Sequence, residues 1–231
     1  MEMAFHLSTC VTPLHGLAAD GRRSVRVFLI HGMGRTTRSM RPLSAALQEA
    51  GFRTSIFGYQ VRRESFEDIA QSFLHFVTRT LSEDEFDGAE YAIVGHSLGN
   101  IITRHISAEL PSGWQRFIML APPNQPAKLA QRLRHHPLFQ GLTKSAGQNL
   151  GDPSFYAGLP VPAVATLVLA GELGGWGRLL PRGERASDGV VSVEETRLMG
   201  AKHRIVPAIH TLIMNHPTVR AEVLQFLQSG S

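Results

Sequence analysis

Six short runs of apolar and β-branched residues recur along the chain, and this recurrence constrains the fold more than any other feature of the sequence. The runs are Val25–Ile30, Arg53–Phe57, Tyr91–Val94, Arg116–Leu120, Ala165–Leu169 and Arg204–Val206. Runs of this length and composition are typical of strands in a parallel sheet, so we expect each of them to be buried on both faces.

Stretches with helical spacing lie between several of these runs. Their apolar faces are marked by Met40, Leu43, Leu47 and Ala50, by Phe66, Ile69, Phe73, Phe76 and Val77, by Ile101, Ile102, His105 and Ile106, and by Val219, Val223, Leu224 and Leu227. The alternation predicts an α/β fold, a mainly parallel sheet of about six strands flanked by helices. Right-handed crossovers then bring the carboxyl ends of the strands to one edge, where ligands normally bind.

Two segments interrupt the alternation. Residues 121–163 contain several prolines, among them Pro122, Pro123, Pro126 and Pro137, and one short amphipathic patch formed by Leu129 with Leu133. We interpret this segment as a cap or lid-like insertion in a single domain that spans residues 1–231. We expect residues 171–187 to form a second long irregular loop around Trp176, and such loops are often functional.

Composition and charge exclude several classes of protein. With 43% hydrophobic and 18% charged residues, the chain can bury a core and is not disordered. Cys10 is the only cysteine, so no intrachain disulfide can form. The net charge of +4 comes from scattered arginines without a basic run, which argues against nucleic-acid binding and is compatible with contact to an anionic lipid surface.

The N-terminal residues lack the basic start and apolar core of a signal peptide. The longest apolar runs are also far shorter than the ~20 residues that cross a bilayer. We therefore expect a soluble, cytoplasmic protein, although a leader removed before residue 1 would leave no trace in this sequence.

The strongest chemical signal is Gly95-His96-Ser97-Leu98-Gly99, which lies between the run Tyr91–Val94 and a helical stretch. In this context the G-x-S-x-G pattern describes a sharp strand-to-helix turn that exposes a serine hydroxyl, with glycines to relieve the crowding. The pattern predicts Ser97 as a nucleophile. The alternative is an ordinary glycine-rich turn.

A second glycine-containing segment, His31-Gly32-Met33-Gly34, directly follows the first run. A tetrahedral intermediate needs two backbone N–H groups directed at its oxyanion. In hydrolases with this turn, one comes from the residue after the nucleophile and one from the loop after an early strand. We therefore expect Leu98 and Met33 to form the oxyanion hole, unless this segment is a plain turn.

Chain order then points to an acid and a base. A serine, an acid and a histidine appear in this order when Asp188 and His210 accompany Ser97, and the carboxylate would orient the imidazole. Glu172, at the end of its strand, is the alternative acid. His216 is the alternative base, although Pro217 indicates that His216 helps to start the last helix.

The remaining candidates concern substrate and metal binding. We expect Met33, His96 and Trp176 to contact the substrate, and His96 also to pack beside the site. An apolar pocket is indicated by cap residues Leu129, Leu133, Leu138, Phe139 and Leu142. The histidines at positions 6, 15, 135 and 136 show no metal-ligand spacing, so we expect no metal ion.

The segments His31–Gly34, Gly95–Gly99 and Ser187–Ser192 together resemble those of bacterial lipases and esterases of the α/β-hydrolase superfamily. The resemblance covers roughly residues 25–228 and is loose over 121–163. It implies an esterase or lipase without a cofactor, with Asp188 as the acid of a Ser-His-Asp triad and the catalytic histidine shortly before the last helix. Because no clear strand precedes residue 25, a six-stranded version of the fold is implied.

The sequence therefore predicts a serine hydrolase that cleaves carboxylic esters of hydrophobic acids, with a small-molecule or lipid ester as substrate. Two alternatives stay open at this point. A thioesterase or acyltransferase would use the same acyl-enzyme, and a non-catalytic binding module could be built on the same fold. The sequence leaves the oligomeric state undetermined.

Overall fold

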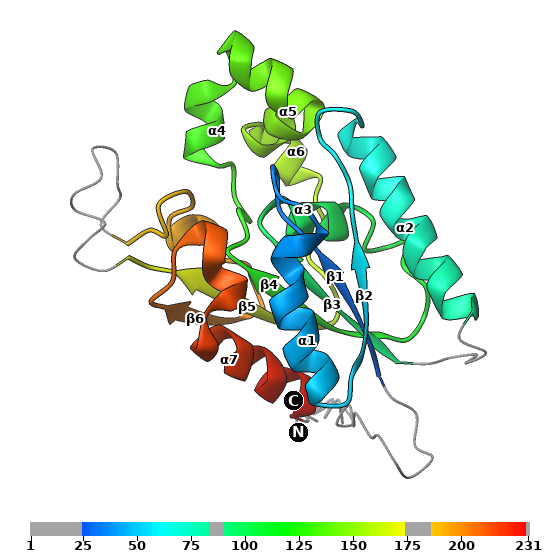
Figure 1. The fold of residues 1–231 in the computed structure, drawn as a ribbon. Helices are drawn as coiled ribbons and strands as arrows, with labels where there is room; N and C mark the ends of the chain where they lie inside the picture. Colours follow the sequence, from blue (N-terminus) through cyan, green and yellow to red (C-terminus); the bar gives the residue numbers. More distant parts are fainter. Residues whose placement is uncertain (1–24, 84–89, 174–185, 230–231) are drawn as a thin grey trace, which may run out of the picture.

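The computed structural model describes residues 25–83, 90–173 and 186–229, and its core is an open sheet of six parallel strands (Figure 1). The strands are β1 (Arg26–Ile30), β2 (Arg53–Phe57), β3 (Tyr91–His96), β4 (Trp114–Leu120), β5 (Ala165–Gly171) and β6 (Lys202–Val206). Their order in the sheet is β2-β1-β3-β4-β5-β6, and every neighbouring pair is parallel. This arrangement confirms the predicted fold class.

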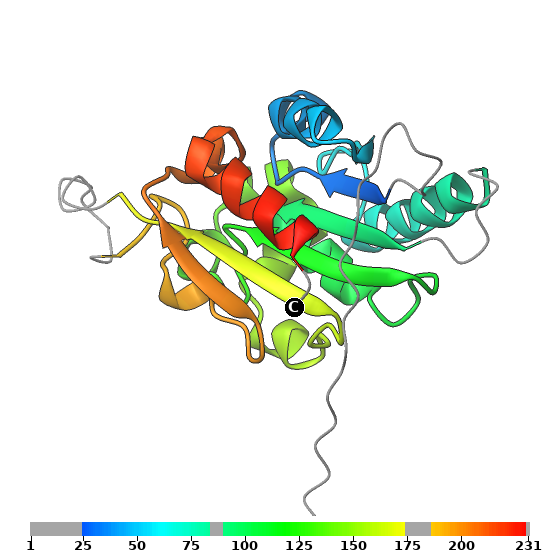
Figure 2. The same cartoon turned by 90° about the horizontal axis from the view of Figure 1, so that it is seen from below.

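Helices cover both faces of the sheet. Helices α1 (Arg41–Glu49) and α7 (Pro217–Gln228) lie together on one face, as Figure 2 shows, and α2 (Phe66–Glu83) and α3 (Leu98–His105) pack on the other. Alternate residues of each central strand supply the two cores: Ile93 faces α2 and α3, whereas Val94 faces α1 and α7. This alternation is the pleat of the strand, which sends successive side chains to opposite faces.

The two edge strands differ from the prediction of burial on both faces. The central strand β3 is buried along its whole length, but β2 and β6 are partly exposed, and Ile205 of β6 is an exposed large hydrophobic residue. The reason is that an edge strand has only one neighbouring strand, so part of its surface faces solvent.

The insertion at 121–163 is more helical than its prolines indicate. It contains α4 (Lys128–Leu133), α5 (Pro137–Leu150) and α6 (Pro153–Ala157), which lie beyond the carboxyl edge of the sheet (Figure 1). Pro137 and Pro153 stand at the first helical positions, where proline fits without loss of a hydrogen bond. Buried Arg104 of α3 joins the insertion to the sheet, since its guanidinium donates to the carbonyl oxygens of Asn124, Leu159 and Pro160.

Three short 3-10 helices complete the described elements: η1 (Thr37–Met40), η3 (Glu194–Thr196) and η4 (His210–Asn215). Within the described ranges, no helix combines the length and the apolar character needed to cross a membrane.

Candidate active site

Ser97 occupies a strained turn between β3 and α3. Its φ and ψ angles are 50° and −119°, a region that residues with a Cβ rarely adopt and that persists only when the surroundings hold it. The holding contacts are a hydrogen bond from Ser97 N–H to the Leu120 carbonyl (2.9 Å) and one from Asn100 N–H to the Ser97 carbonyl (3.0 Å). Asn100 also donates through Nδ2 to the same Leu120 oxygen, at 3.1 Å.

The glycines of the Gly95–Gly99 turn are required by close packing. A Cβ on Gly95 would collide with the Asn100 side chain, and a Cβ on Gly99 would lie 2.8 Å from the carbonyl oxygens of Ile30 and His31. The turn therefore packs directly against the end of β1. This close approach brings the His31–Gly34 loop to the serine.

Asp188, in the loop after β5, and His210, after β6, meet Ser97 at the carboxyl edge of the sheet. His210 Nε2 lies 3.0 Å from Ser97 Oγ, and His210 Nδ1 lies 2.7 Å from Asp188 Oδ2. All three side chains are buried or nearly so. The structure thus brings together the three residues that the sequence predicts as nucleophile, acid and base, although they are up to 113 positions apart in the chain.

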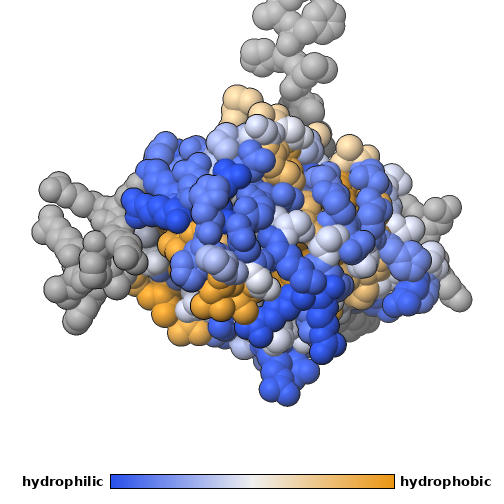
Figure 3. All heavy atoms as spheres, turned by 90° about the horizontal axis from the view of Figure 1, so that it is seen from above, coloured by the Kyte–Doolittle hydropathy of each residue, from blue (hydrophilic) through white to orange (hydrophobic). Residues whose placement is uncertain are grey.

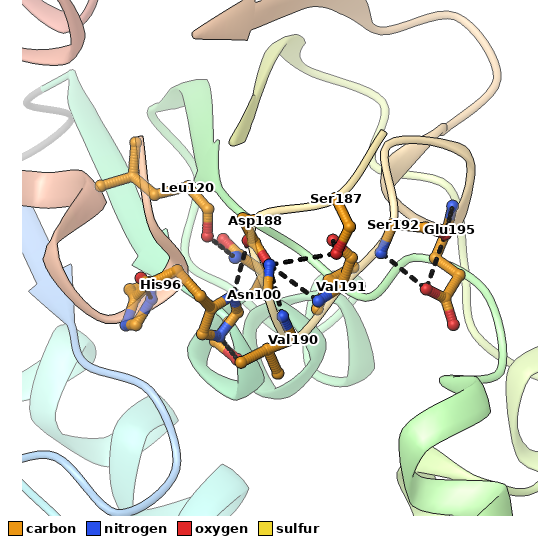
Figure 4. A network of polar contacts seen from close by, with 12 residues as sticks. His96, Asn100, Leu120, Ser187, Asp188, Val190, Val191, Ser192 and Glu195 are labelled. Carbon is orange, nitrogen blue, oxygen red and sulfur yellow. Dashed lines mark hydrogen bonds and ion pairs between the residues drawn. The ribbon is translucent and has the colours of Figure 1, made fainter. Parts of the chain in front are cut away.

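The loop that carries Asp188 orients its carboxylate through backbone donors. Asp188 Oδ1 accepts from the N–H groups of Val190 (2.9 Å) and Val191 (2.8 Å), which leaves Oδ2 for His210 (Figure 4). The main chains are also joined, because His210 N–H donates to the Asp188 carbonyl at 3.1 Å. A Cβ on Gly171, at the end of β5, would lie 2.7 Å from Asp188 Cβ, so the loop packs tightly on the sheet edge.

Buried Glu195 anchors the same loop, and the sequence analysis missed it. Its carboxylate accepts from Ser192 N–H and Oγ, both at 2.7 Å, and from the N–H of Lys128 at the start of α4, also at 2.7 Å. Figure 4 shows Ser192 and Glu195 beside the Asp188 loop. The serine with a glutamate three positions later, a spacing typical of capping boxes, was the available signal.

His96 lies beneath the turn rather than at its surface, with 1% of its area exposed. Its Nε2 donates to the main-chain oxygen of His210 at 3.0 Å, and the two rings are 5.0 Å apart. Burial, followed by the nearby His210, holds the pKa of His96 well below its usual value, so the ring is neutral. A substrate contact for His96 stays a prediction, whereas its contact with the His210 backbone is part of the structure.

The loop after β1 presents Met33 near the serine. A Cβ on Gly32 would lie 2.9 Å from Ser97 Cβ, and a turn closes from Arg35 N–H to the Gly32 carbonyl at 3.2 Å. Across the described residues, neither Met33 N–H nor Leu98 N–H donates to a protein acceptor. Leu98 begins α3, where helix geometry leaves the first N–H groups free.

Buried His31 and Tyr59 fix this loop. The two rings stack with centroids 4.3 Å apart, and Tyr59 Oη donates to the His31 carbonyl at 2.8 Å. His31 Nδ1 donates to the Gly32 carbonyl (2.9 Å), and Nε2 accepts from Tyr59 N–H (3.3 Å). Burial lowers the pKa of His31, and one neutral tautomer satisfies both bonds. No sequence pattern marked Tyr59.

The alternative residues occupy other positions. Glu172 follows β5, and its N–H donates to the Val206 carbonyl, but its side chain bonds to no described residue. His216 is the N-cap of α7, with Pro217 at the first helical position, as the sequence predicts. Trp176 lies outside the described residues. No cluster of three or more metal-binding side chains occurs in the ranges that the structure describes.

Comparisons with known proteins agree with this architecture. A family model described as serine aminopeptidase, S33, matches residues 21–150. The mature lipase BlEst2 from Bacillus licheniformis superposes with a TM-score of 0.74 at 15% identity, over 94% of this chain and 100% of that one. A soluble variant of monoglyceride lipase from Saccharomyces cerevisiae gives 0.62 at 15% identity, over 98% of both chains.

Phospholipase PlaB from Legionella pneumophila has a TM-score of 0.71 and 20% identity, over 91% of this chain, which spans about 60% of PlaB. No curated protein matches the sequence. At these identities the structural likeness concerns the fold alone. The family match, in contrast, covers more than half of the sequence, and with the sheet described above it shows that the chain belongs to the serine aminopeptidase, S33, family of α/β hydrolases.

Proposed function

We propose that the protein is a serine hydrolase that cleaves carboxylic esters of hydrophobic acids through an acyl-enzyme on Ser97. One observation carries the proposal: His210 lies between Ser97 Oγ, at 3.0 Å from Nε2, and Asp188 Oδ2, at 2.7 Å from Nδ1. A nucleophile within hydrogen-bond reach of a base, which a third group orients, is the arrangement of covalent acyl transfer.

The proposed first step forms the acyl-enzyme. His210 Nδ1–H donates a hydrogen bond to Asp188 Oδ2, so the Nε2 lone pair faces Ser97. Nε2 takes the hydroxyl proton as Oγ attacks the ester carbonyl, and the N–H groups of Met33 and Leu98 stabilise the oxyanion. When the tetrahedral intermediate collapses, the C–O bond to the alcohol breaks and His210 gives its proton to the departing oxygen.

The second step releases the acid. Water attacks the acyl carbon while His210 removes its proton, and the bond from that carbon to Ser97 Oγ then breaks. The proton returns to Ser97, which restores the free enzyme. Buried Asp188 stabilises the imidazolium during both steps without being protonated.

Exposed apolar side chains beside the two catalytic loops support an apolar acyl group. Val190 follows Asp188 by two residues, and Ile209 and Leu212 flank His210, with 40%, 40% and 47% of their surface exposed. Seen from above, apolar patches interrupt a largely hydrophilic surface (Figure 3). The lipases of similar fold support a small-molecule or lipid ester as substrate, and contact with a lipid surface is part of this proposal.

The cap belongs to the same proposal. We assign residues 121–163 to a cap within one domain, because Lys128 donates to Glu195 of the Asp188 loop and Phe66 N–H donates to Ser145 Oγ of α5. Leu129 and Leu138 are exposed on this cap. They could contact an acyl chain that extends from the site.

Peptide hydrolysis, which the family description names, would need a carboxylate to bind a free amino terminus. Asp188 and Glu195 are the buried acidic residues of the described chain, and N–H donors or His210 already occupy both. Glu172, half-buried directly after β5, has no side-chain partner among the described residues, so the preference for esters over amino-terminal peptides rests on the exposed apolar side chains beside the catalytic loops.

The test is hydrolysis of p-nitrophenyl butyrate and p-nitrophenyl decanoate, together with labelling by a fluorophosphonate. We expect Ser97→Ala to lose labelling and to lower kcat by roughly 10⁴-fold or more. Ser82→Ala, an exposed serine of α2, is the matched control and should retain both. Unchanged hydrolysis by Ser97→Ala would exclude Ser97 as the nucleophile, and a folded wild type that neither labels nor hydrolyses would indicate a binding module.

A further inference from the structure

A polar pocket of about 370 Å³ opens beside the candidate active site. Its lining residues are Gly34, Arg35, Thr36, Arg38, Ser39, Pro42 and Asn215. One wall continues the loop that carries Met33, and the other is the end of η4, the 3-10 helix that begins at His210. The pocket therefore lies between extensions of the two segments that would supply the oxyanion donor and the base.

The charge of this pocket is positive and uncompensated. Arg35 and Arg38 line it, and none of the lining residues is acidic. Throughout the described chain, neither arginine forms an ion pair or a side-chain hydrogen bond. An arginine normally finds a carboxylate or phosphate partner when it is partly buried, because its planar fork of donors fits such groups.

Buried polar atoms in the pocket lack partners. Arg35 Nε and Asn215 Oδ1 are both buried without a hydrogen bond to any described residue. Native proteins leave few such atoms unsatisfied, and both side chains would have to shift before a bound group could reach these two atoms.

Arg35 is close enough to the site to act on it electrostatically. Its N–H closes the turn on the Gly32 carbonyl, at 3.2 Å. Its positive charge also helps to lower the pKa of His31 and of His96, for each of which burial is the larger cause. A group held by Arg35 would thus be part of a substrate whose ester lies at Ser97.

We propose that the Arg35–Arg38 pocket binds an oxyanionic group of the substrate, a carboxylate or a phosphate, and so selects acidic esters over neutral ones. This inference rests on the proposed function, since it assigns the substrate class of the same site. The exposed apolar residues near Asp188 and His210 would contact the acyl chain, and the pocket would bind the charged part of the molecule.

The kinetic test uses matched pairs of esters. One pair is 1-butyrylglycerol and 1-butyrylglycerol 3-phosphate, and the other is p-nitrophenyl butyrate and the p-nitrophenyl monoester of glutaric acid. We expect Arg35→Gln and Arg38→Gln to raise KM for the anionic member at least tenfold more than for its neutral partner. Arg79→Gln, which removes the same charge from the exposed surface of α2, should leave the ratio of KM values unchanged.

The two pairs also identify the anion. A larger effect on the phosphate pair would place a phosphate on the alcohol side, and a larger effect on the glutarate pair would place a carboxylate on the acyl side. Equal effects of both substitutions on the anionic and neutral members would overturn the proposal while leaving ester hydrolysis intact. Arg38 is exposed, so Arg38→Gln carries the test even if Arg35→Gln does not fold.

A binding experiment separates the pocket from the proposed reaction. Calorimetric titration of Ser97→Ala with glycerol 3-phosphate and glutarate needs no turnover, with glycerol as the neutral control. Suppose that the wild type hydrolyses no ester but that Ser97→Ala binds an anion, and that the further substitution Arg38→Gln abolishes this binding. This result would support the proposed pocket and reject the proposed esterase activity. Without hydrolysis and without anion binding, both proposals would be wrong.

Discussion

At the scale of single residues, the candidate site depends on side chains that hold the reacting groups as much as on the reacting groups themselves. His96 is the clearest example, because its neutral ring donates to the main-chain oxygen of His210 and lies beneath Gly32. It thus contacts both loops that converge on Ser97. A side chain that acts through such contacts is a positioning residue.

We therefore expect His96→Phe to lower kcat for p-nitrophenyl butyrate by about tenfold while KM changes little, because small misplacements of a base reduce the rate of the chemical step. His96→Gln, which keeps a donor near the same position, should recover part of the loss. His135→Gln, an exposed histidine of the cap, is the control. If His96→Phe raised KM and left kcat unchanged, His96 would bind substrate instead, as the sequence analysis expected.

Residue identities explain why the sequence alone could locate much of the candidate site. The G-x-S-x-G pattern, the following order of Asp188 and His210 and the glycines after the first strand are all local signals. Ser192 and Glu195 have the spacing of a capping box, but nothing local indicates the bond between Tyr59 and His31 or the bond between Glu195 and Lys128, which join residues 28 and 67 positions apart. Contacts across such separations depend on the tertiary fold and leave no periodic pattern in the sequence.

At the scale of elements, the strands were predictable to within a few residues because a buried strand in a parallel sheet is continuously apolar. The structure extends β3 through His96 and β5 through Gly171, beyond the ends of the predicted runs. The cap was less predictable. Its prolines indicate an insertion outside the core, but Pro137 begins α5 in the structure, since proline tolerates the first turn of a helix.

The Asp188 loop shows how one element depends on another. Glu195→Ala would leave the N–H and Oγ of Ser192 and the N–H of Lys128 without their acceptor. Because Glu195 is buried, we expect a loss of about 2–4 kcal/mol in the free energy of unfolding and a lower kcat as the loop loosens. Urea denaturation and p-nitrophenyl butyrate hydrolysis would measure the two effects.

Glu194→Ala is the matched control for this experiment. Glu194 lies in the same 3-10 helix, but it pairs only with exposed Arg197, at 2.8 Å, and exposed pairs contribute little stability. It should therefore change the free energy of unfolding by less than about 0.5 kcal/mol. Equal losses for both variants would show that Glu195 does not anchor the loop.

At the scale of the whole molecule, the residues of the candidate site gather at the carboxyl edge of the sheet, where parallel α/β folds normally bind ligands. His31 and His96 both lie at the ends of adjacent strands, and both are buried. A third histidine, His203, lies away from this edge, near the start of β6, where it is half-buried and bonds to Thr196 at 2.8 Å. Burial is the main reason why the pKa of each of these three side chains is lowered.

These histidines predict how stability depends on pH. As pH falls below about 6.5, these histidines bind protons in the unfolded chain but stay neutral in the folded chain, because they have the ordinary pKa of histidine only when unfolded. The stabilisation is therefore fully present above pH 6.5 and is lost towards the lowered pKa values of the folded state. Each histidine that stays neutral in the folded state would lower the free energy of unfolding by up to about 1.4 kcal/mol for each pH unit below about 6.5.

We accordingly expect the free energy of unfolding, measured in urea, to decrease between pH 7 and pH 5. The lowered pKa of Asp68, which Ser65 stabilises by hydrogen bonds, acts only below about pH 4, so it does not contribute in this window. His31→Gln should reduce the dependence of the free energy of unfolding on pH, since one buried histidine is removed. His135→Gln, on the surface of the cap, should leave this dependence unchanged. A free energy of unfolding that stayed constant from pH 7 to pH 5 would contradict the conclusion that these histidines are neutral in the folded protein.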